Sequence, residues 1–136
     1  MKDSSYPIRK ALTTIITALG YQVFDRVPEL TASPYCWIYN QSYYQDGTQE
    51  DFGQIASVSI DVVAMYDKDF GGAKTTDDMS GAIIHALCNF APLPITIIGF
   101  ETLAITLEGT NNLFETTATH AIYTTTIRLK FKLFET

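Results

Sequence analysis

The alternation of side chains in the closing run THAIYTTTIRLKFKLF, residues 119–134, constrains the fold more than any other feature. Successive side chains of a strand point to opposite faces, so an alternating run predicts a strand that is buried on one face. The expected buried face holds Tyr123, Thr125, Ile127, Leu129, Phe131 and Leu133. The opposite face carries three cations, Arg128, Lys130 and Lys132. The chain is therefore expected to build a half-buried sheet.

Two segments have the hydrophobic spacing of helices that bury one stripe. In residues 4–20 the stripe consists of Ile8, Leu12, Ile15, Ile16 and Leu19. Ser4 or Ser5 is placed to cap the start of this helix, and Gly20 is placed to end it in a left-handed conformation. In residues 77–90 the stripe consists of Met79, Ile83, Ile84, Leu87 and Cys88.

The other predicted strands are shorter or interrupted. Residues 21–24 predict a short strand, and residues 34–44, which are rich in aromatic side chains, predict a longer one. Residues 55–66 alternate, with an expected inward face of Val58, Ile60, Val62 and Ala64. The acidic stretch 45–54 between these two strands is expected to be the exposed loop of a hairpin. Residues 95–109 predict a strand that is broken near Gly99, and residues 109–117 predict a loop.

This order of elements predicts a single α+β domain over residues 1–136. We expect a mostly antiparallel sheet of about four to five strands, with two helices packed on one face. The chain is 46% hydrophobic, which is enough for one core at this length. No segment approaches the roughly 20 apolar residues of a membrane span, and no signal peptide is expected.

Charge and cysteine content exclude some classes of function. Nine basic residues against fifteen acidic ones give a formal net charge of −6. Because phosphate backbones are bound by clustered cations, specific binding to nucleic acid is not expected. Cys36 and Cys88 stand among apolar residues and form no C-x-x-C pair. Both are expected to be small buried side chains in a reducing compartment.

The stretch DFGGAKTTDD, residues 69–78, resembles the magnesium-binding triplet of kinases followed by a phosphate loop. The spacing of a phosphate loop is absent, because Ala73 separates Gly72 from Lys74 and no glycine stands five residues earlier. A kinase would also need an H-R-D loop. We therefore expect a turn followed by a helix, with Thr75 or Thr76 as the cap and two aspartates in the first turn.

Other candidates for catalysis are weak. His85 and His120 are far apart in sequence and lack the spacing of metal ligands, so both are expected to be partly buried structural residues. Ser57 and Ser59 have no nucleophile-elbow glycines around them. No catalytic residue, metal or cofactor is expected, and the protein is not expected to be an enzyme.

The aromatic residues of the strand 34–44 are the more informative feature. Tyr35, Trp37, Tyr39 and Tyr43 are expected to share one face. Such a face fits a core or a protein interface, where tyrosine and tryptophan concentrate, or a base-stacking platform, which would need a cationic groove. The candidate interface comprises Tyr39, Tyr43, Tyr44, Asp46, Glu50, Asp51 and Phe52.

The whole order resembles the tail terminator family of long-tailed bacteriophages, also called tail-completion or minor tail proteins. An N-terminal amphipathic helix leads into VFDRVPE (residues 23–29), which resembles the family's short strand and turn. PYCWI (34–38) resembles its next strand, and residues 56–87 resemble its long strand, glycine-bearing turn and second helix. The closing strand also resembles the family's last strand.

The resemblance implies a structural protein of the virion, assembled in the host cytoplasm. Family members form a hexameric ring that ends tube polymerisation at the head-proximal end of the tail. The implied partners are further copies of the chain, the tail tube protein and the head–tail connector or stopper protein. DNA would pass through the ring without specific binding, and no membrane is involved. Two alternatives remain: another neck or tail-tube protein, or a small non-catalytic ligand-binding α+β domain.

Overall fold

A computed structural model describes residues 3–28, 32–45, 53–67, 69, 71–88 and 95–136. Its helices are α1 (Ser5–Ala18) and α2 (Lys74–Cys88). Its strands are β1 (Val23–Phe24), β2 (Tyr35–Gln45), β3 (Gly53–Asp67), β4 (Phe100–Thr116) and β5 (His120–Glu135). The predicted α+β class is confirmed. None of the described helices is long and apolar enough to cross a membrane.

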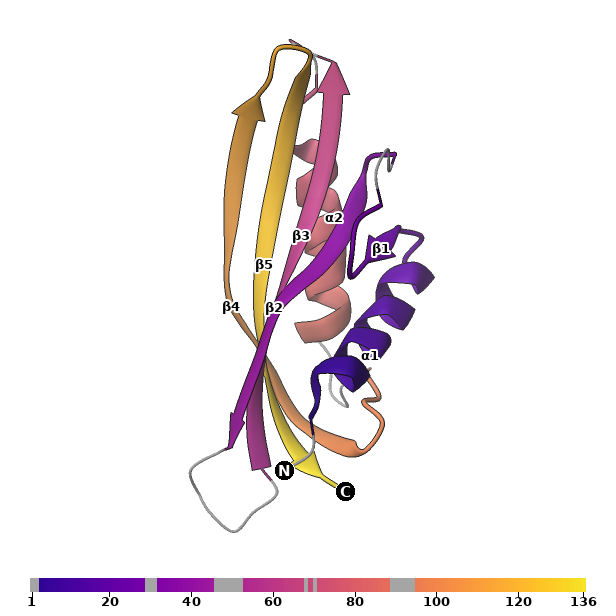
Figure 1. Ribbon diagram of the computed structural model, residues 1–136, viewed down its shortest axis with the longest axis vertical. Helices are drawn as coiled ribbons and strands as arrows, with labels where there is room; N and C mark the ends of the chain where they lie inside the picture. Colours follow the sequence, from indigo (N-terminus) through magenta and orange to yellow (C-terminus); the bar gives the residue numbers. More distant parts are fainter. Residues whose placement is uncertain (1–2, 29–31, 46–52, 68, 70, 89–94) are drawn as a thin grey trace.

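The five strands form one sheet in the order β1-β2-β3-β5-β4. Only the short β1 runs parallel to its neighbour, whereas β2, β3, β5 and β4 are antiparallel in turn. β3, β4 and β5 extend beyond the end of β2, and both helices lie on the same side of the sheet (Figure 1). The mostly antiparallel sheet and the packing of two helices on one face are therefore confirmed.

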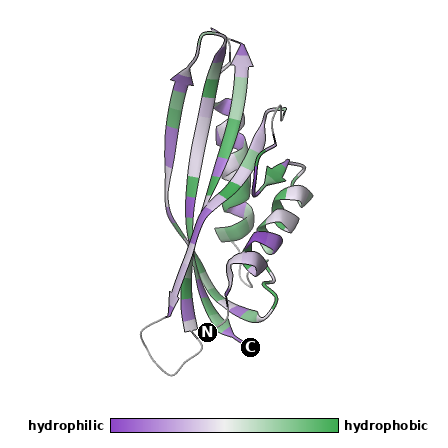
Figure 2. Ribbon diagram, in the orientation of Figure 1, coloured by the Kyte–Doolittle hydropathy of each residue, from purple (hydrophilic) through white to green (hydrophobic). Residues whose placement is uncertain are grey.

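The core lies between the helices and this covered face. Apolar and polar residues alternate along the central strands (Figure 2), as the sequence pattern predicts. In β5 the inward residues Ile127, Leu129, Phe131 and Leu133 are completely buried. Each such side chain contributes roughly 1.5–3 kcal/mol by leaving water. Their neighbours in β3 include two of the predicted inward residues, paired as Val58↔Leu129 and Ile60↔Ile127, together with Ala56, which pairs with Phe131.

β4 corrects the prediction of a loop at residues 109–117. Residues 110–116 pair continuously with β5, from Thr110↔Ile127 to Thr116↔Ala121. Gly109, Asn111 and Asn112 favour turns, and residues 111–116 are exposed, so no buried face shows in the sequence. Hydrogen bonding to β5 overrides these local preferences. Only the part of the predicted strand 95–109 that follows Gly99 is a strand: Gly99 has a φ of 90° and β4 begins immediately after it, whereas residues 95–99 belong to no strand.

The helix ends differ in detail from the prediction. Ser4 is the N-cap residue of α1, as predicted, but its side chain makes no capping hydrogen bond. The Asp3 carboxylate instead accepts the Ser5 N–H at 2.8 Å, and this bond lowers the pKa of Asp3. Gly20 has a φ of 93°, as predicted for a helix terminator. α2 begins at Lys74, so Thr75 and Thr76 lie inside its first turn rather than at the cap. Of the two aspartates predicted for the first turn, Asp77 lies in it and Asp78 does not.

Candidate subunit interface

A bulge in β2 divides its aromatic residues between the two faces of the sheet. Tyr39 pairs with Ser59, but the next pair is Ser42↔Ser57, so β2 contains one residue more than β3 at this point. Asn40 takes up the extra length with a φ of 50°. The bulge reverses the alternation, because side chains change faces with every residue. Trp37 and Tyr39 therefore lie on the open face, which the helices do not cover.

The prediction that Tyr43 shares this face is wrong. Tyr43 pairs with Ala56, whose side chain is in the core, and its ring packs against the core cluster. Tyr44 points the other way and is 53% exposed. Of the candidate interface residues, Tyr39 and Tyr44 therefore lie on the open face. Asp46, Glu50, Asp51 and Phe52 fall outside the described residues.

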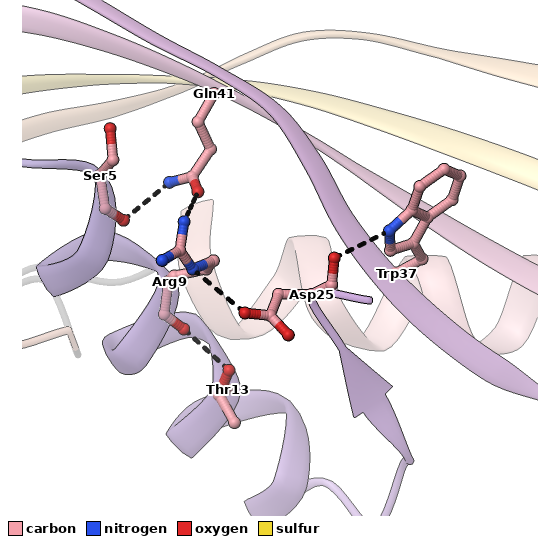
Figure 3. Close-up of polar contacts among 6 residues, drawn as sticks. All are labelled: Ser5, Arg9, Thr13, Asp25, Trp37 and Gln41. Carbon is pink, nitrogen blue, oxygen red and sulfur yellow. Dashed lines mark hydrogen bonds and ion pairs between the residues drawn. The ribbon is translucent and has the colours of Figure 1, made fainter. Parts of the chain in front are cut away.

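A polar network fixes the bulge to the first helix (Figure 3). The Arg9 guanidinium donates to Gln41 Oε1 at 2.8 Å, and Gln41 Nε2 donates to the Ser5 carbonyl at 2.8 Å. Arg9 Nε also lies 3.7 Å from Asp25 Oδ2, in the turn after β1. The network joins α1, β2 and the end of β1. These contacts attach the outer edge of β2 to α1 at the point where β1 ends.

The aromatic side chains beside the bulge are also held in place. The rings of Trp37 and Tyr39 are stacked, with centroids 4.6 Å apart and planes inclined by 18°. Trp37 Nε1 donates to the Asp25 carbonyl at 3.2 Å, and the Tyr39 hydroxyl donates to Asp61 Oδ1 at 3.0 Å. Burial and the Asp61 carboxylate raise the pKa of Tyr39, so its hydroxyl stays protonated as a donor. A stacked pair fixed at both ends suits recognition of a partner.

Both edges of the sheet are open in the described part of the chain. β1 pairs only with Cys36 and Trp37, so the outer edge of β2 from residue 38 onward faces no strand. β4 pairs with β5 on one side alone. An open edge presents unpaired N–H and C=O groups to any other chain. β4 also carries exposed apolar side chains, namely Leu103, Leu107, Leu113 and Phe114.

The sequence did not reveal a groove between α1 and the segment before β4. Tyr6, Pro7 and Ala11 line one side of a hollow of about 560 Å³, and Thr96 and Ile98 line the other. Ile98 is 66% exposed, although Ile95 and Ile97 on either side of Thr96 are buried. The alternation of residues 95–98 was the available signal that two of these side chains face outward.

The glycine-rich stretch between β3 and α2 has a structural explanation. Gly71 has a φ of 92°, and the ring of Tyr66 lies against it, where any Cβ would stand. The Tyr66 hydroxyl in turn donates to Thr75 Oγ1 at 2.9 Å. Lys74 pairs with Asp78 at 2.7 Å, one helical turn away, instead of facing a phosphate cradle. The stretch forms a tight turn under a tyrosine.

The remaining candidate residues are the two histidines and the two cysteines. His85 and His120 are both exposed, so the prediction of partly buried histidines is wrong. No three His, Cys, Asp or Glu side chains of the described residues come together as a metal site requires. Cys36 and Cys88 are free thiols; Cys36 is buried, as predicted, which raises its pKa to about 12, whereas Cys88 is only half-buried.

The fold is similar to that of a protein of known structure, although the sequence matches no family. No known family model matches the sequence, and no curated protein matches it. The structure is similar to that of a chain in the virion of a native gene transfer agent (GTA) particle, with a TM-score of 0.68 at 16% identity. The similarity covers 97% of this chain and 99% of the virion chain. The two chains therefore share one fold over their whole described length.

Proposed function

We propose that this chain is a structural protein of a tailed virion, which forms a ring on the head-proximal end of the tail tube. The observation that carries the proposal is a sheet with two open edges on opposite sides. A fold shared with a chain of a gene transfer agent virion supports it. In this role the protein ends tube polymerisation and offers a surface to the connector or stopper protein.

The topology of the sheet suits closure into a ring. β2, β3, β5 and β4 reverse direction at each step, so β4 runs antiparallel to β2. In a ring whose axis follows the strands, all subunits point the same way. The open edge of β4 before residue 111 then meets the open edge of the next subunit's β2, from residue 38 onward, as an antiparallel pair, because β1 occupies the edge of β2 at Trp37. Such a contact joins two different patches, and this is the kind of contact that closes rings.

The same arrangement suggests where DNA would pass. With the helices outside, the open face of the sheet lines the bore. By register it carries Asp61, Asp67, Glu101 and Glu115 together with Arg128, Lys130 and Lys132, and Glu108 forms an ion pair with Lys130. The five carboxylates outnumber the three cations, so the described part of this face has a modest acidic excess and does not hold phosphates tightly. This suits a bore through which the duplex passes without specific binding, although the wall is not the purely acidic one that the net charge alone favours.

One observation favours an alternative. The groove between α1 and Ile98 is mostly apolar, has about 560 Å³ and could hold a small molecule or a partner's side chains. A non-catalytic ligand-binding domain would use this groove as a monomer. A tail-tube protein would share the ring but would stack into longer tubes, whereas another neck protein would form a ring at a different position in the particle. The mass of the assembled protein separates the monomer, the single ring and the tube.

We expect the purified protein to form a homohexameric ring at high concentration or on tail tubes, visible by electron microscopy and native mass spectrometry. Tyr44→Glu should prevent ring formation, because it leaves an unpaired carboxylate at the β2 edge at a cost of a few kcal/mol per contact. Thr17→Glu is the control, since Thr17 is also exposed but lies in the last turn of α1, away from the β2 edge. A wild-type protein that stays monomeric under both conditions would refute the ring.

A further inference from the structure

Arg128 is an exposed cation that leans toward the open edge of β4. It stands on β5 directly opposite Gly109, and one of its terminal nitrogens would lie 3.2 Å from a Cβ built on that glycine. The guanidinium therefore lies across β4, over the one position of the strand that has no side chain. Nearby, Lys130 Nζ forms an ion pair with Glu108 Oε2 at 3.8 Å. Arg128 forms no ion pair with any described residue.

The register places Arg128 level with the aromatic pair at the other edge of the sheet. Tyr39 pairs with Ser59, Ser59 pairs with Arg128, and Arg128 pairs with Gly109. Tyr39 and Gly109 therefore stand at the same height on opposite edges. Tyr39 and Arg128 also share the open face. β2 and β4 are both bulged near this level, at residues 39–42 and 107–109 respectively.

We infer that Arg128 of one subunit stacks on the Trp37–Tyr39 pair of the next subunit and so fixes the register of the ring. The inference rests on the proposed ring. When β4 meets the neighbouring β2 at this height, about one strand spacing of roughly 4.8 Å separates Gly109 from the neighbour's Tyr39. The guanidinium that already covers Gly109 then reaches the aromatic faces. Arginine is well suited to this contact because its planar cation stacks on tryptophan and tyrosine.

The occupant of the aromatic pair is therefore a second copy of the chain. Both halves of the contact are present in every subunit, at opposite edges and on one face, as a head-to-tail ring requires. The competing occupant of Arg128 is the phosphate backbone of DNA in the bore. These two differ in what they need: the contact between copies depends on the aromatic residues, whereas phosphate binding does not.

The test changes Tyr39 in one variant and Arg128 in another, and then mixes the two variants. Tyr39→Arg alone should oppose the neighbour's Arg128, and Arg128→Glu alone should lose the stacking, so each variant should need at least a tenfold higher concentration to form rings. Mixed in equal amounts, the two variants should assemble again in strict alternation. At one contact the glutamate introduced by Arg128→Glu meets the arginine introduced by Tyr39→Arg as an ion pair. At the next contact the native Arg128 meets the native Tyr39. Only rings with an even number of subunits can close in this way. A variant that had failed to fold could not be rescued by mixing.

Lys132→Ala is the control, since Lys132 is an exposed cation of the same strand and face. It should assemble like the wild type. If the wild type forms rings and both variants do so equally well alone, the inference is wrong while the proposed ring stands. If Arg128→Glu rings form normally but bind duplex DNA more weakly in an anisotropy titration, Arg128 faces DNA and the inference is also overturned. A wild type that forms no ring refutes the proposed function instead.

Discussion

Replacing Phe131 with alanine is expected to lower the free energy of unfolding by about 3–5 kcal/mol. Phe131 is completely buried on the central strand β5, with Ala56 and Ile105 as its partners on β3 and β4. The substitution removes apolar contacts and leaves a cavity that the flanking strands cannot fill without losing their register. For a domain of this size, the midpoint of thermal unfolding should fall by roughly 10–20 °C.

Phe134→Ala provides the matched control, because Phe134 is on the same strand but faces away from the core and is 42% exposed. It should cost less than about 1.5 kcal/mol. Urea titrations followed by circular dichroism would give both values. Equal losses for the two variants would contradict the assignment of the buried face, and with it the register of β5.

Gly71→Ala is expected to destabilise the protein by roughly 2–4 kcal/mol. The backbone at Gly71 has a φ of 92°, which is strained for any residue with a side chain. The new methyl group would also overlap the ring of Tyr66, which must then leave its edge-on contact with Tyr123, at a centroid distance of 5.9 Å. Both effects act on the turn that joins β3 to α2.

Gly72→Ala is the control, because it shows whether an alanine anywhere in this turn lowers the stability. A Cβ on Gly72 would meet nothing within 4 Å, so Gly72→Ala should change the stability by less than about 1 kcal/mol. Differential scanning calorimetry of the two variants would measure both changes in stability. If Gly71→Ala were as stable as Gly72→Ala, the tight turn under Tyr66 would not exist as described.

Patterns that come from burial were predictable from the sequence. The alternation in residues 119–134 predicted β5 and its inward residues, because one face of that strand is buried along much of its length. The helical stripe predicted α2 for the same reason, with Met79, Ile83 and Leu87 all buried. By contrast, the outer half of β4 is held by pairing with β5 and has no buried face, so the sequence suggested a loop.

The candidate site depends on features that a local pattern does not contain. A single extra residue near Asn40 moves Tyr43 from the open face to the core, and no glycine or proline marks that bulge. Tyr39 and Gly109 stand at the same height because three successive strand pairings connect them, between segments that are far apart in the sequence. Likewise, the open edges follow from the order of strands in the sheet, which the order along the chain does not specify.

The position of the protein in a particle tests the central proposal most directly. Cryo-electron microscopy of purified tailed particles that encode this chain should show one ring of it per tail, at the head-proximal end of the tube. The β4 edge of each subunit should pair there with β2 of the next, and particles lacking the chain should have overlong or unjoined tails. Copies repeated along the tube, or complete particles without the chain, would contradict the assignment.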